Sequence, residues 1–115
     1  MNLDDEIGVY GRWPGKLKAY LKKPDGSLKV ADLRVDDKCA LGHWIHEEEA
    51  KLAAMDEYAA LKDLHARFHA AAADIVALAD GGQTEPAEAA LGKKDFRVLF
   101  GRLISALIQM KNKVP

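Results

Sequence analysis

The sequence predicts an all-α protein, an antiparallel four-helix bundle whose first helix is short or kinked. Alanine, leucine, glutamate and lysine dominate its middle and C-terminal thirds, where β-branched residues are sparse. Apolar residues recur at steps of three and four over two long stretches of that region. A short glycine-containing turn joins the two stretches, so they are expected to lie antiparallel. The length of 115 residues suits a single helical domain over residues 1–115.

The first predicted helix covers roughly residues 13–21. Pro14 suits a first helical turn, so the helix is expected to start near Trp13 or to be kinked there. The run Lys23-Pro24-Asp25-Gly26-Ser27 is a strong stop and turn signal. Residues 28–35 alternate weakly between apolar and polar side chains, which indicates an irregular or extended connection.

The second predicted helix begins at a cap provided by Asp36 or Asp37 and runs to about Leu52. The third has the clearest periodicity and ends at Gly81-Gly82. Its apolar stripe consists of Tyr58, Leu61, His65, Phe68, Ala72, Ile75 and Ala79.

The fourth predicted helix begins at Thr84-Glu85-Pro86, which combines a cap with proline in the first turn. It continues to about Met110, with apolar residues on one face. Four such helices with short connections favour an up-and-down bundle.

The composition excludes several classes of partner. The formal net charge is −1, so no basic surface is expected to attract nucleic acid. No stretch approaches the roughly 18 consecutive apolar residues of a membrane span. A single cysteine rules out an internal disulfide and favours a cytoplasmic location. That thiol is therefore a buried apolar group, a reactive group or a metal ligand.

Three side chains suit a metal site. His65 and His69 stand four residues apart on the third helix, so both rings project from one face and can bind one ion. His65 belongs to the apolar stripe, where an imidazole without a polar partner is costly. Cys39 lies near the start of the second helix, where a thiolate is favoured. The alternative is a hydrogen-bonded core histidine and a cysteine that only fills space.

The combination of Cys39-x-Leu41-Gly42-x-Trp44 with His65-x-x-x-His69 resembles the chemoreceptor zinc-binding (CZB) domain family. The resemblance extends from about Ile7 to Met110. It implies a four-helix fold, one zinc ion bound by three histidines and a cysteine, and frequent homodimerisation. It also implies a role in regulating bacterial chemotaxis receptors and diguanylate cyclases, with zinc itself or an oxidant as the stimulus.

The sequence departs from the family at one ligand. The family has a histidine three residues before a tryptophan in helix 1, but here that run reads Tyr10-Gly11-Arg12-Trp13. A phenol must lose a proton to bind zinc well. Only Cys39, His65 and His69 therefore carry over. The fourth ligand stays open among Tyr10, water and His43, which lies within about 40° of Cys39 on an ideal helix.

The function expected from these residues is a zinc-binding sensory or regulatory domain of bacterial signalling. We expect it to act through association, as a homodimer or with a chemoreceptor or cyclase-type signalling partner. The alternative is a degenerate, metal-free helical interaction module that keeps the fold. A hydrolytic zinc enzyme is disfavoured because no general base such as the glutamate of HExxH adjoins the histidines.

Overall fold

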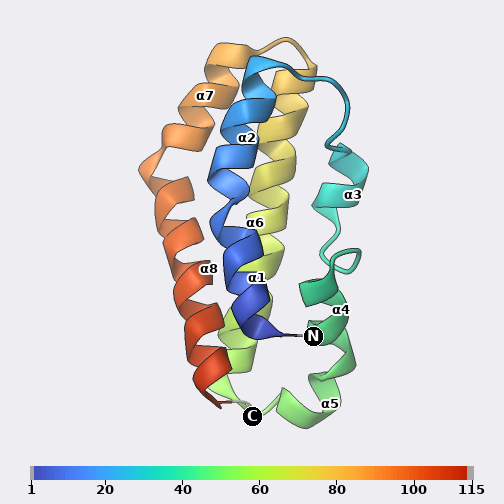
Figure 1. Cartoon of the computed structure of the whole chain (residues 1–115), viewed down its shortest axis with the longest axis vertical. Helices are drawn as coiled ribbons and strands as arrows, with labels where there is room; N and C mark the ends of the chain where they lie inside the picture. Colours follow the sequence, from blue (N-terminus) through green and yellow to red (C-terminus); the bar gives the residue numbers. More distant parts are fainter. Residues whose placement is uncertain (1, 114–115) are drawn as a thin grey trace.

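The computed structural model describes residues 2–113, and these residues form helices with no β-strand among them (Figure 1). The predicted all-α class is therefore confirmed. The helices in chain order are α1 (Leu3–Gly11), α2 (Trp13–Lys22), α3 (Val30–Arg34), α4 (Ala40–Glu47), α5 (Glu49–Leu52), α6 (Asp56–Asp80), α7 (Thr84–Gly92) and α8 (Lys94–Lys113).

The helices form four legs that run up and down the long axis of a body measuring 43 × 25 × 20 Å (Figure 1). α1 and α2 form the first leg, and α3, α4 and α5 descend beside α6 as the second. α6 alone is the third leg, and α7 and α8 return as the fourth. This is the predicted bundle with a kinked first helix. None of the helices in residues 2–113 is both long and apolar enough to cross a membrane.

The first leg begins earlier than the sequence predicted. α1 starts at Leu3, where the Asn2 side chain accepts a hydrogen bond from the Asp4 amide at 2.8 Å. The leg bends at Arg12, between α1 and α2. Pro14 explains the bend, because it has no N–H to donate to the Tyr10 carbonyl and its ring crowds that oxygen. The early start matters because it places Tyr10 on a helix.

Three further features differ from the prediction. Residues 30–34 form the short helix α3, where an irregular or extended connection was expected. The second long helix was expected to be capped by Asp36 or Asp37, but α4 begins at Ala40 and Cys39 is its N-cap. The fourth leg is divided at Lys93, whose backbone is extended (φ −65°, ψ 146°).

α6 is the central helix of the core. Its apolar side chains pack against the buried faces of α2, α4 and α8. His65 is fully buried within this core and His69 is 5% exposed. The predicted apolar stripe of the third helix is buried as a whole: Tyr58, Leu61, His65, Phe68, Ala72, Ile75 and Ala79.

Candidate metal centre

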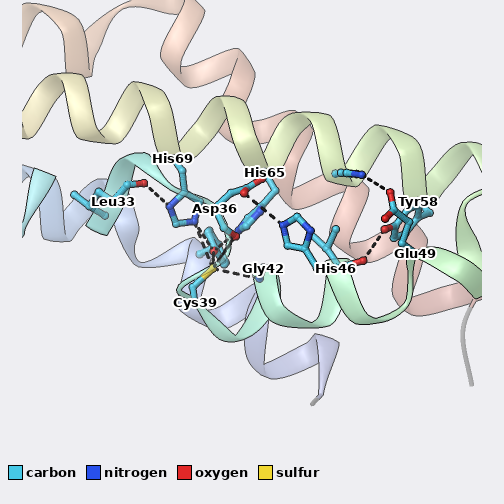
Figure 2. A network of polar contacts seen from close by, with 12 residues as sticks. Leu33, Asp36, Cys39, Gly42, His46, Glu49, Tyr58, His65 and His69 are labelled. Carbon is cyan, nitrogen blue, oxygen red and sulfur yellow. Dashed lines mark hydrogen bonds and ion pairs between the residues drawn. The ribbon is translucent and has the colours of Figure 1, made fainter. Parts of the chain in front are cut away.

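The structure brings Cys39, His65 and His69 together (Figure 2). The Cys39 Sγ lies 3.3 Å from Nε2 of His65 and 3.6 Å from Nε2 of His69. The three potential ligand atoms all lie within 4.8 Å of one another. The sulfur comes from the start of α4 and both nitrogens come from the middle of α6, so the group spans two legs of the bundle.

Gly42 allows the chain to hold Cys39 in this position. The Cys39 sulfur accepts a hydrogen bond from the Gly42 amide at 3.3 Å, which caps α4. A Cβ atom on residue 42 would lie only 1.7 Å from the Asp36 carbonyl oxygen. Glycine is therefore required for the segment before Cys39 to cross the first turn of α4 so closely.

The imidazole of His69 is held in the tautomer that a metal ligand needs. Its Nδ1 lies 2.9 Å from the Leu33 carbonyl oxygen, which can only accept a hydrogen bond. Nδ1 therefore carries a hydrogen, and in the neutral ring Nε2 is the nitrogen left to bind a metal. Histidines that bind metals usually donate their other ring N–H in this way. The short helix α3 supplies the acceptor.

His65 has polar contacts only through Nε2. Its Nδ1 is buried and has no hydrogen-bond partner among residues 2–113. A core histidine retained for structure alone is expected to satisfy both nitrogens, because an unpaired buried polar atom costs about 1–3 kcal/mol. The contacts of Nε2 with Tyr10 and Cys39 direct this nitrogen at the cluster, while Nδ1 lacks the second hydrogen bond that His69 makes.

Tyr10 is the fourth member of the cluster. Its hydroxyl oxygen lies 2.8 Å from Nε2 of His65, 2.9 Å from Nε2 of His69 and 3.2 Å from the Cys39 sulfur. The Tyr10 side chain is 1% exposed, so its hydroxyl is shielded from solvent, whereas Cys39 is only partly buried. His43, the other protein candidate for a fourth ligand, is exposed and lies outside the group.

The surroundings of the cluster shift the pKa values of Cys39 and Tyr10 in opposite directions. Burial raises the pKa of the Cys39 thiol, but hydrogen bonds with His65, His69 and Tyr10 outweigh burial and lower that pKa to about 5. The thiolate is therefore the stable form at neutral pH, which is the form that binds metals. Burial and the nearby Cys39 raise the pKa of Tyr10, which keeps the phenol protonated.

Glu6 was not identified from the sequence. It lies one helical turn before Tyr10 and is only 8% exposed. Burial and the negative charge of Cys39 raise the pKa of its carboxyl group. A buried carboxyl beside a buried thiolate is costly unless a cation is near. The only signal in the sequence was its spacing of four residues from Tyr10 in a helix that was not predicted.

The donor atoms suit zinc in kind and in spacing. Two imidazole nitrogens and a thiolate are preferred zinc ligands. Bond lengths of about 2.3 Å to sulfur and 2.0–2.1 Å to nitrogen place these atoms about 3.5 Å apart in a tetrahedral site. The observed sulfur–nitrogen distances of 3.3 and 3.6 Å agree with that value. The two sulfur–nitrogen edges therefore fit a tetrahedral zinc site, and the two nitrogens lie within 4.8 Å of each other.

Comparison with known proteins agrees with this chemistry. The family model described as chemoreceptor zinc-binding domain matches residues 12–76, which include Cys39, His65 and His69 but not Tyr10. Searches of curated proteins and of solved structures returned no match. The family match covers more than half of the 115 residues. On this match, the chain belongs to the chemoreceptor zinc-binding domain family.

Proposed function

We propose that this protein is a zinc-binding sensory or regulatory domain in which Cys39, His65 and His69 hold the ion. The observation that supports it most directly is the convergence of a thiolate and two imidazole nitrogens from separate helices on one buried point. The lowered pKa of Cys39 and the tautomer of His69 both favour metal binding. The family description names zinc binding and no reaction, so we propose no enzymatic activity.

The signal in this proposal is a change in how α4 packs on α6. Cys39 is the N-cap of α4 and the histidines belong to α6, so bound zinc supplies a cross-link between two legs of the bundle. Loss of zinc, or oxidation of the Cys39 sulfur, removes that link. Residues 1–115 would act as one domain in the cytoplasm. They would pass the change to a second copy or to a chemoreceptor or cyclase-type signalling partner.

Elemental analysis of the purified protein tests the proposal. We expect close to one zinc ion per chain in the wild type and strong depletion in Cys39→Ala and His69→Ala. His43→Ala is the matched control, because His43 is an exposed histidine on α4 that lies outside the cluster. This control should retain the metal.

A wild-type protein that neither carries zinc after purification nor takes it up from zinc-containing buffer contradicts the proposal. The same folded, metal-free result in all four proteins would instead indicate the helical interaction module without a metal. Circular dichroism of each variant separates loss of a ligand from loss of the fold.

A further inference from the structure

The four polar atoms of the cluster lie close to one another, like the ligand atoms around a tetrahedral metal ion. Five of the six distances among the Tyr10 oxygen, the Cys39 sulfur and the two Nε2 atoms range from 2.8 to 3.6 Å. Tetrahedral zinc with oxygen, nitrogen and sulfur ligands has edges of about 3.3–3.6 Å. The three distances to the phenol oxygen are the shortest, and all three lie within hydrogen-bonding range.

We propose that Tyr10 is the fourth zinc ligand of this protein, through its phenol oxygen. This inference rests on the proposed zinc site and completes it. It replaces the nitrogen that the family resemblance implied with an oxygen. The ligand set becomes two nitrogens, one sulfur and one oxygen, drawn from α1, α4 and α6.

Solvent access favours Tyr10 over a water molecule in the fourth position. Tyr10 is 1% exposed and His65 is fully buried, so the hydroxyl already fills the space next to both nitrogens. Aromatic neighbours also hold the phenol ring in place. Tyr10 packs edge-on against Phe68 with ring centres 5.8 Å apart, and against His65 at 5.6 Å.

Charge balance also favours an anionic oxygen. Counting the metal ligands alone, a divalent ion with one thiolate and neutral ligands leaves a net charge of +1 beside the buried His65 and His69, which is costly. A phenolate in addition to the thiolate makes the centre neutral. On coordination the zinc–oxygen bond replaces the O–H bond of Tyr10, and the proton leaves to the buffer. A bound dication reverses the preference of a buried acid for its protonated form.

Tyr10→Phe tests the proposal with little change to the core, because only the hydroxyl is removed. Tyr58→Phe is the matched control, since Tyr58 is also buried but donates its hydroxyl to the Ile45 carbonyl, away from the cluster. Zinc affinity is measured by competition with a chromophoric chelator. The near-ultraviolet difference spectrum on zinc addition reports ionised tyrosine, and folding of each metal-free variant is checked by circular dichroism.

We expect the tyrosinate band in zinc-loaded wild type and Tyr58→Phe, and its absence in Tyr10→Phe. The zinc affinity of Tyr10→Phe should fall by more than the roughly 10–100-fold that loss of an outer hydrogen-bond partner costs. Tyr10→His should restore tight binding without the band. A zinc-loaded wild type that lacks the band overturns the proposal and leaves the three-ligand site intact. A wild type that binds no zinc overturns both.

Discussion

Gly42 controls the position of the cysteine ligand at the scale of a single residue. The Asp36 carbonyl occupies the space that a side chain on residue 42 would need. The Gly42 amide also donates to the Cys39 sulfur, so the same residue provides room for the loop and a hydrogen bond for the thiolate. In the sequence, Gly42 stands out only as part of the run Cys39-x-Leu41-Gly42-x-Trp44. The structure supplies the reason for it.

Gly42→Ala is expected to destabilise the protein by about 1–3 kcal/mol or more, because the new Cβ must displace backbone rather than a side chain. The displaced segment carries Cys39, so zinc affinity should also fall. Urea denaturation and chelator competition measure the two effects.

Gly101→Ala is the control for Gly42→Ala. Gly101 is an exposed residue inside α8, and a Cβ there meets nothing within 4 Å. Alanine should therefore stabilise α8 by about 0.5–1 kcal/mol and leave zinc affinity unchanged. Equal stability of Gly42→Ala and wild type would show that the loop is free to move away, against the packing described above.

At the scale of elements, the proposed zinc site makes α4 the part of the bundle that would depend most on the metal. It has only eight residues, and helices shorter than about 12–15 residues are marginal without outside contacts. Its buried residues are few, namely Leu41, Gly42 and Ile45. The cluster at its N-cap is therefore a large share of what holds it against α6.

Amide hydrogen exchange should detect this dependence. We expect zinc to slow exchange in residues 40–47 much more than in α8, which contributes no ligand and packs along α6 through its own apolar face. His43→Ala should keep the effect and Cys39→Ala should abolish it. Equal slowing in α4 and α8 would argue for a general stabilisation and against a local change at α4.

The elements also show what the sequence could predict. The third helix was predicted because its apolar stripe runs without interruption from Tyr58 to Ala79, and the same stripe placed His65 in the core. α1 was missed because its buried face consists of Leu3, Glu6 and Tyr10, of which one is a carboxylic acid. A search for apolar periodicity misses a helix whose buried face includes polar side chains such as those of Glu6 and Tyr10.

The candidate metal site could be predicted only in part, because some of its features do not depend on residue type. Cys39, His65 and His69 were identified because spacing and motif are visible in a linear sequence. The Leu33 carbonyl that orients His69 is a backbone atom from α3, and no residue type reports it. The fourth position stayed open because His43 and Tyr10 were separated only by the folded structure, which exposes the first and buries the second.

At the scale of the whole molecule, the fold does not depend on zinc for its core. Leu17, Leu61, Phe68, Leu103 and Met110 are among the side chains with at most 1% exposure, and they come from α2, α6 and α8. The chain is thus unlike a small zinc finger, which unfolds without its ion. The metal-free protein should unfold cooperatively, at a lower temperature than the zinc-bound protein.

The size of that difference follows from mass action. Free zinc at 100 times its dissociation constant adds about 2.7 kcal/mol to the free energy of unfolding. For a chain of this length, about 4 °C per kcal/mol makes the melting temperature rise by roughly 10 °C. Calorimetry with added zinc and with a chelator should show this rise in the wild type and none in Cys39→Ala. Once chelated, the wild type should stay somewhat the more stable of the two, because Cys39→Ala also removes the N-cap of α4. A wild-type melting temperature that is indifferent to both additives would contradict a structural role for the metal.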